Sequence, residues 1–470
     1  MPASRVDLIL RGGTLVTAAD AYEASVAVQG ERIVAIGPDA VLPDAEREID
    51  VRGKLVFPGA IDCHIHLGPE YDDWRGGPHA AAHAGLTTLV GFGVPEAGET
   101  LPQAVHRLRE EASRGSVLDF GFHLILPPQP DLVDGIPEAV RLGISSFKLF
   151  MTYKKRGRMC SDEFICRVME RIAAQGGVTQ LHCENGEVVD YLENKAIAEG
   201  RVRPADFPPT CPDWIEEEAV NRAVKLGALT GSPVYVVHLS SQLGLERIKQ
   251  AQATGQRVWA ETCPQYLLLT DAEMETWGPL AKIGPPLRPA GGPDREALWR
   301  GAAQGFVSTV ASDHSPRSQA AKAPGWKNIF VDEAGQSVPF GSPSVETLVP
   351  LVYGEGVVKR GLPPSWMARV LAENPARIFG LYPRKGVIRV GADADFLIVD
   401  PEAAWTIRVA DQKGMAGWTL YEGWPVKGRP WMTLLRGQVV LNQGKLEQAP
   451  GYGQYLPRGG PVPPIAGAAR

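Results

Sequence analysis

The stretch Asp62-Cys63-His64-Ile65-His66-Leu67 follows an apolar run and places two histidines two residues apart. In a β-strand, residues at i and i+2 point to the same face, so both imidazoles would face one side. Neutral imidazole is a common ligand of zinc and related divalent metals. A His-x-His pair at the end of a strand is therefore half of a metal site, and its other ligands must come from elsewhere in the chain.

After this strand, short apolar runs alternate with amphipathic helical segments, a pattern typical of parallel strands joined by crossover helices. Eight runs are expected to be strands: residues 55–66, 87–92, 118–126, 146–151, 179–184, 234–239, 258–263 and 308–313. Helices are expected between them, including residues 101–113, 162–175 and 214–229. Eight such units predict an α/β fold, a TIM (β/α)8 barrel, whose chemistry lies at the C-terminal ends of the strands.

Both ends of the chain differ from this middle part, because they contain short strands separated by turns and no helical periodicity. We expect residues 1–54 and 383–446 to pair into one small β domain, which leaves residues 55–382 for the barrel. The tail, residues 447–470, is rich in Pro and Gly. We expect the tail to be disordered or to lie against a neighbouring subunit.

The composition excludes several classes of protein. The net charge of -6 argues against a nucleic-acid partner, which needs a basic surface. Six cysteines without a C-x-x-C pair favour a reducing compartment. The N-terminal residues lack the pattern of a signal peptide, and no apolar stretch approaches the length of a membrane span. These features predict a cytoplasmic protein with no membrane partner.

Side chains that can bind a metal occur at the ends of five predicted strands. They are His64 and His66 after the first strand, Lys148 in the fourth, His182 after the fifth, His238 after the sixth and Asp313 after the eighth. Taken singly, His182 or His238 could be an ordinary core histidine, and Asp313 could cap the helix that follows it. Six such residues at one end of a barrel predict a shared metal centre.

Lys148 lies within the apolar run of residues 146–151. Burying an ammonium there is costly unless its charge is altered. A lysine that is held neutral can react with carbon dioxide to form a carbamate. This group is an anionic ligand with two oxygens, and it can bridge two cations.

With these and other motifs, the chain resembles the cyclic amidohydrolases of the dihydropyrimidinase and hydantoinase branch, from residue 7 to about residue 442. The motifs are residues 57–66 (FPGAIDCHIH), 147–154 (FKLFMTYK), 181–186 (LHCENG), 218–223 (EAVNRA), 236–240 (VVHLS), 261–269 (ETCPQYLLL), 284–288 (GPPLR) and 312–314 (SDH). The resemblance implies a barrel flanked by a small β-sandwich made from both termini. It also implies a homo-oligomer, either a tetramer or a dimer.

The resemblance further implies two divalent metals. One metal would be held by His64, His66 and Asp313, the other by His182 and His238, with carboxylated Lys148 as the bridge. Zinc is the first expectation, and Mn, Co or Fe also suit these ligands.

The reaction implied is hydrolysis of a small cyclic amide, a dihydropyrimidine or a 5-substituted hydantoin, to an N-carbamoyl amino acid. A hydroxide between the two metals would attack the ring carbonyl. Asp313 would pass the proton to the departing nitrogen, and Tyr153 would stabilise the oxyanion.

The substrate-binding positions depart from the family pattern. Gly284 stands where the family commonly has serine, and Pro343 opens a Pro-Ser-Val-Glu run where it commonly has Asn-Gly-Val-Glu or a close variant. The family grips the ring amide there through main-chain groups, and both residues keep a carbonyl. The loop after the fourth strand is basic, and one of Lys155, Arg156 or Arg158 could meet an anionic group on the substrate. The alternative is a solvated basic surface loop.

Three other functions remain open at this point. Within the class, the chain could be an allantoinase-like or dihydroorotase-like enzyme, or hydrolyse some other amide. A mononuclear hydrolase would leave Lys148 unmodified. A non-catalytic assembly protein of the same fold, such as the collapsin response mediator relatives, would lack the metal ligands, whereas all six are present here.

Overall fold

The computed structural model describes residues 5–464. The first four residues of the predicted terminal domain and the last six of the predicted tail lie outside this range.

The middle of the chain forms an eight-stranded parallel sheet whose strands follow one another in sequence order. The strands are β6 (Ala60–His66), β7 (Leu86–Gly93), β8 (Asp119–Ile125), β9 (Ser146–Phe150), β10 (Val178–His182), β11 (Val234–Val236), β12 (Val258–Thr262) and β13 (Thr309–Val310). An isolated parallel bridge between Ile65 and His314 joins the first strand to the segment after the last one, with His66 N–H donating to His314 O over 2.8 Å. The predicted TIM-like arrangement of eight parallel strands is confirmed.

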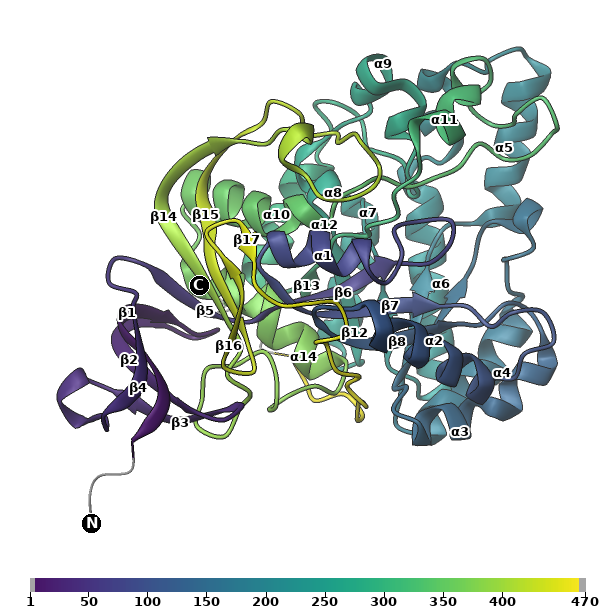
Figure 1. Cartoon of the computed structure of the whole chain (residues 1–470). Helices are drawn as coiled ribbons and strands as arrows, with labels where there is room; N and C mark the ends of the chain where they lie inside the picture. Colours follow the sequence, from purple (N-terminus) through teal and green to yellow (C-terminus); the bar gives the residue numbers. More distant parts are fainter. Residues whose placement is uncertain (1–4, 465–470) are drawn as a thin grey trace.

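Helices separate the strands and cover the sheet (Figure 1). Their bounds are α1 (Gly76–His83), α2 (Leu101–Gly115), α3 (Ile136–Arg141), α4 (Asp162–Ala174), α5 (Gly186–Ala198), α6 (Asp213–Thr230), α7 (Gln242–Ala253), α8 (Pro264–Leu268), α9 (Glu273–Trp277), α10 (Asp294–Gln304), α11 (Gln319–Lys322), α12 (Val345–Leu351), α13 (Pro364–Ala368) and α14 (Asn374–Ile378). The start of α2 shows why these segments are helical. Thr100 and Gln103 form a reciprocal capping box, and Leu101, Val105 and Leu108 then bury one face.

Both ends of the chain meet in a second, nine-stranded sheet, as the sequence predicted. Its strands are β1 (Val6–Val16), β2 (Ala21–Gln29), β3 (Arg32–Gly37), β4 (Ala45–Asp50), β5 (Leu55–Pro58), β14 (Phe396–Thr406), β15 (Pro425–Leu435), β16 (Gln438–Asn442) and β17 (Lys445–Leu446). The N-terminal strand β5 pairs with C-terminal β14, so purple and yellow-green segments lie side by side in Figure 1. A separate apolar cluster with members from both ends, among them Val26, Val56 and Ile398, packs this sheet.

The first predicted strand divides into two. Residues 55–66 read as one run, but β5 pairs with the terminal sheet and only β6 belongs to the parallel sheet. Gly59 lies between them, where an added Cβ would collide with Thr87 Oγ1 and Asp395 Cβ. The chain therefore crosses from one sheet to the other at a residue that must be small, four residues later than the expected boundary.

The C-terminal tail is ordered as far as the structure describes it, so the expected disorder is wrong for residues 447–464. Tyr455 stacks on Phe122, and Phe120 exchanges main-chain hydrogen bonds with Gln454 and Leu456 on either side. The Arg458 guanidinium is buried and donates to main-chain carbonyls of the barrel, those of Phe122 and Phe379. The tail therefore packs on strand β8 of its own chain.

Two further features bear on the composition arguments. Among residues 5–464, no helix is long and apolar enough to cross a membrane. All six cysteines are unpaired.

Candidate metal centre

His64, His66 and Asp313 converge at the C-terminal end of the parallel sheet. Their ligand atoms all lie within 4.8 Å of one another. Asp313 Oδ1 is 3.1 Å from His64 Nε2 and 3.6 Å from His66 Nε2. Both histidines sit in strand β6, whose alternation turns them to one face, as the His-x-His spacing predicted. No helix begins at Asp313, so the capping alternative is wrong.

A buried carboxylate accepts a hydrogen bond from His64 Nδ1 and so orients the ring. Glu261, in strand β12, accepts a hydrogen bond from His64 Nδ1 over 2.6 Å and another from the His238 main-chain N–H over 3.0 Å. Its other oxygen accepts from the Tyr235 hydroxyl over 2.8 Å. Because Nδ1 is occupied in this way, Nε2 of His64 is the nitrogen turned toward Asp313.

His182 and His238 form the second half of the cluster. Their ring centroids are 4.4 Å apart, and the His238 ring is 5.4 Å from that of His64. Glu184 Oε2 accepts a hydrogen bond from His182 Nε2 over 2.5 Å, which leaves Nδ1 of His182 for a ligand. A buried glutamate therefore orients one histidine in each half of the cluster: Glu261 orients His64, and Glu184 orients His182.

Lys148 is 1% exposed and lies between the faces of two aromatic rings. Its Nζ is 4.8 Å from the Phe92 ring centroid and 5.3 Å from that of Phe150. Burial lowers the pKa of Lys148 to about 8. The sequence argument that this lysine is buried within an apolar strand is borne out by its position.

The two histidines of β6 have different pKa values when no metal is bound, because their surroundings differ in charge. For His64, burial works to lower the pKa, but the carboxylates of Glu261 and Asp313 outweigh it and raise the pKa to about 9. For His66, burial dominates and lowers the pKa to about 4. Burial would raise the pKa of Asp313, but His64 and His66 hold it well below its usual range, so Asp313 is a carboxylate at neutral pH.

Three residues of the site have left-handed backbone conformations that non-glycine residues seldom adopt. The φ angles are 64° at Tyr153, 37° at His238 and 49° at Asp313. Such conformations cost of order 1–3 kcal/mol each and persist only where the surroundings impose them. Tyr153, His238 and Asp313 each lie two or three residues after the end of a strand, namely β9, β11 and β13.

All six predicted ligands line one cavity of about 460 Å³, together with Tyr153, Gly284, Arg156 and Arg158. Lys155 does not line it, and its ammonium is paired with Glu193 over 3.0 Å. Pro343 is buried but is outside the lining of this cavity. The structure therefore brings together every predicted ligand but only some of the predicted substrate contacts.

The residues at this end of the sheet fit a divalent cation. Within the described chain, the buried His238 Nδ1 has no hydrogen-bond partner, and His64 Nε2 faces only the Asp313 carboxylate. Leaving such atoms unpaired is costly unless they bind something else. Imidazole nitrogens, a carboxylate and a lysine that can become a carbamate form a donor set suited to zinc or similar metals.

Tyr153 stands over the cluster with its ring packed edge-on against His182, at a centroid distance of 4.9 Å. Burial raises the pKa of its phenol well above the usual range, so the hydroxyl stays protonated. A Cβ built on Gly284 would meet the Tyr153 hydroxyl at less than 3.0 Å and Phe340 Cδ1 at 3.2 Å. Glycine at 284 thus leaves room for the tyrosine.

The sequence reasoning assigned no role to Glu184, Glu261 or Phe340. Glu261 carried a usable signal, since a carboxylate within the apolar run of strand β12 must have a buried partner. Glu184 sits two residues after His182, a spacing that could have indicated a histidine partner. Phe340 lies in a loop without any pattern that would place it at the site.

Comparisons with known proteins agree with this geometry. Residues 55–440 match the model of the Amidohydrolase family. The chain is 35% identical over 461 residues to a D-hydantoinase of Geobacillus stearothermophilus, covering 96% of each protein, and 31% identical to an L-hydantoinase of Paenarthrobacter aurescens, covering 96% of this chain and 98% of that one. It superposes on the crystal structure of a dihydropyrimidinase from Brevibacillus agri with a TM-score of 0.91 and 35% identity, over 97% of this chain and 99% of the other.

Proposed function

The chain belongs to the amidohydrolase family and is a hydrolase of cyclic amides, and from this premise we propose that it opens a dihydropyrimidine or 5-substituted hydantoin ring to an N-carbamoyl amino acid. The observation that supports the ring-opening site is the convergence of six side chains able to bind metal in one cavity, with the buried His238 Nδ1 left unpaired. In this reaction, water adds across a ring C–N bond. Its hydroxyl joins the carbonyl carbon, and its proton goes to the departing nitrogen.

The proposed metal set follows the grouping in the structure. His64, His66 and Asp313 would hold one cation and His182 and His238 the other, with a carbamate on Lys148 contacting both. When bound, two such cations lower the pKa of a shared water and polarise the ring carbonyl. Zinc is the expected metal, with Mn, Co or Fe as alternatives. The burial of Lys148 between Phe92 and Phe150 supports the carbamate, because a neutral amine is the form that reacts with carbon dioxide.

Two side chains would act on the substrate. Asp313 is a carboxylate at neutral pH, so its oxygen can accept the proton of the attacking water and deliver it to the departing ring nitrogen. Tyr153 keeps its hydroxyl proton and can donate it in a hydrogen bond to the oxygen that gains charge. Gly284 and Pro343 would hold the ring amide through main-chain groups. For Gly284 this is supported by its place in the cavity, whereas Pro343 lies just outside.

Several finer expectations belong to the same proposal. The eight-stranded sheet would close as a (β/α)8 barrel spanning residues 55–382, and the terminal sheet would fold on itself as a sandwich. The protein would be cytoplasmic and a homo-oligomer, a tetramer or a dimer. Arg156 and Arg158 line the same cavity as the candidate metal ligands, and their contact with an anionic ring substituent stays a prediction.

A panel of rings tests the proposed activity. The metal-loaded protein is mixed with 5-benzylhydantoin, dihydrouracil, allantoin and dihydroorotate, and loss of ring absorbance is followed together with the mass of the product. We expect turnover of the first two rings, and loss of turnover in His64→Ala and Lys148→Ala. His106→Gln, which changes an exposed histidine on α2, is the control. Turnover of only allantoin or dihydroorotate would select the allantoinase or dihydroorotase alternative, and no turnover of any ring would refute the proposal.

A further inference from the structure

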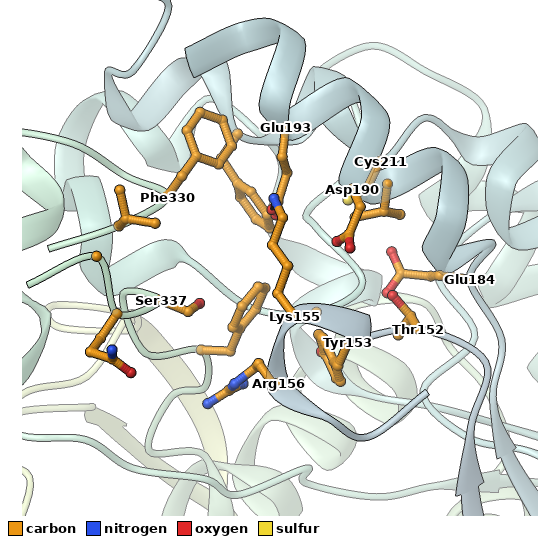
Figure 2. A pocket seen from close by; sticks show the side chains of 17 residues that line it. Thr152, Tyr153, Lys155, Arg156, Glu184, Asp190, Glu193, Cys211, Phe330 and Ser337 are labelled. Atoms are coloured by element: carbon orange, nitrogen blue, oxygen red, sulfur yellow. Dashed lines mark hydrogen bonds and ion pairs between the residues drawn. The ribbon is translucent and has the colours of Figure 1, made fainter. Parts of the chain in front are cut away.

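A second cavity of about 370 Å³ adjoins the one lined by the candidate metal ligands. The two cavities share four lining residues, which are Tyr153, Arg156, Gly284 and Phe340. We call the second cavity the side chamber. Figure 2 shows the Lys155 side chain crossing its middle, with Glu184 and Asp190 on one side and Phe330 and Ser337 on the other. Tyr153 therefore borders both the side chamber and the cavity lined by the candidate metal ligands.

The side chamber is lined by three carboxylates, Glu184, Asp190 and Glu193, and by two cations, Lys155 and Arg156. Lys155 pairs with Glu193 over 3.0 Å, so these two charges cancel. The Asp190 carboxylate makes no hydrogen bond or ion pair with the rest of residues 5–464. Glu184 is 3% exposed and gives one oxygen to His182, but its Oε1 has no partner although it is buried against the chamber. An unpaired buried carboxylate oxygen indicates a missing hydrogen-bond donor.

Aromatic faces complete the walls and are suited to a cation. The chain already places the Lys282 ammonium 4.4 Å from the Phe340 ring centroid and 5.5 Å from that of Phe207. The Arg156 guanidinium lies over the rings of Tyr153 and Phe340, at 5.6 Å from each. The faces of such rings attract positive charge.

We propose that the side chamber binds the cationic end, a protonated amine or a guanidinium, of a substituent carried by the substrate ring. The cation would donate to Glu184 Oε1 and the Asp190 carboxylate while its alkyl stem lies along Tyr153 and Phe340. This inference rests on the proposed function, because it requires the ring itself to lie at the metal ligands. It differs from the predicted contact of Arg156 and Arg158 with an anionic substituent, because it assigns a cationic substituent to the side chamber.

Two matched rings test the inference. One is 5-(4-aminobutyl)hydantoin, and the other is 5-pentylhydantoin, in which a methyl group replaces the ammonium. The wild-type protein is expected to favour the aminobutyl ring in kcat/KM. In Asp190→Asn that preference should fall by roughly 10-fold, as expected for loss of a hydrogen bond to a charged group. Glu187→Gln is the control, because it removes the same charge one turn earlier on α5 but outside both cavities.

The failure of this inference can be told apart from failure of the proposed function. A wild-type protein that opens the pentyl ring at least as well as the aminobutyl ring overturns the side-chamber assignment and leaves the proposed function intact. An Asp190→Asn protein whose preference is unchanged, or is changed equally by Glu187→Gln, also overturns it. If neither ring is opened, calorimetric binding of the two rings decides. Tighter binding of the aminobutyl ring that Asp190→Asn abolishes supports the chamber, and equal binding overturns it.

Discussion

Replacing Gly284 by serine, the residue common in the family, is expected to harm this protein. A Cβ at position 284 would lie within 3.0 Å of the Tyr153 hydroxyl, whereas ordinary contacts of a Cβ begin near 3.4 Å. Phe340 Cδ1, at 3.2 Å from the same point, blocks escape of the new side chain in that direction. The tyrosine must therefore withdraw its hydroxyl by about 1 Å from the place where it would donate to the substrate. A misplacement of that size in an active site can cost about 10²-fold in rate.

A double-mutant cycle measures this effect directly. We expect Gly284→Ser and Gly284→Ala to lower kcat by roughly 10- to 100-fold, equivalent to about 1.4–2.7 kcal/mol of transition-state stabilisation. In a Tyr153→Phe background the clashing oxygen is gone, so the same substitutions should cost less than about 3-fold. Alanine separates the effect of the Cβ from that of the serine hydroxyl. Equal losses in both backgrounds, or no loss in either, would refute the placement of Tyr153.

Three further predictions concern the surroundings of the site. Glu261→Gln keeps the shape of the carboxylate but removes the negative charge beside His64 Nδ1, so metal binding should weaken by 10- to 100-fold in competition with a chelator. An unchanged metal affinity would contradict the role of Glu261 in orienting His64. Burial lowers the pKa of Lys282 from 10.5 to about 7, so above pH 7 the unfolded chain binds more protons than the folded one and the free energy of unfolding rises by up to ~1.4 kcal/mol per pH unit. Denaturant unfolding of Lys282→Met at pH 7 and 9.5 should lack that rise. An equal rise in the wild-type protein and in Lys282→Met would disprove the prediction. Neutralising Arg156 and Arg158 together should slow opening of a carboxylated ring more than that of an uncarboxylated one, and equal slowing would favour a solvated surface loop.

The eight-stranded parallel sheet and the convergence of the six candidate ligands were predictable because both depend on strong local patterns. Eight apolar runs separated by amphipathic segments indicate parallel strands whatever their exact ends. The C-terminal ends of such strands share one rim, so histidines and an aspartate in different runs meet without any knowledge of their contacts. Lys148 was identifiable for a related reason, since an ammonium in an apolar strand requires a special role.

Other features depend on contacts between distant residues, which no local pattern records. The division of residues 55–66 into β5 and β6 follows from the pairing of β5 with β14, more than 330 residues away. The tail looked disordered because it has no apolar periodicity. A few anchors, Tyr455 and Arg458 among them, nevertheless fix it to strand β8.

The side chamber likewise combines residues from the loop after β9, from α5 and from the segment around Phe340. Its lining could not be read from spacing, because Asp190 and Glu193 look like ordinary surface residues of helix α5. Substrate preference is therefore the property for which the structure adds most to the sequence.

The most direct test of a two-metal centre bridged by a modified lysine is metal content measured together with electron density at Lys148 in one crystal of protein loaded in bicarbonate. We predict two divalent ions per chain, near His64 and His238, and density for a carboxylate on Nζ of Lys148. A bare ammonium at Lys148, with one ion or none per chain, would contradict the account.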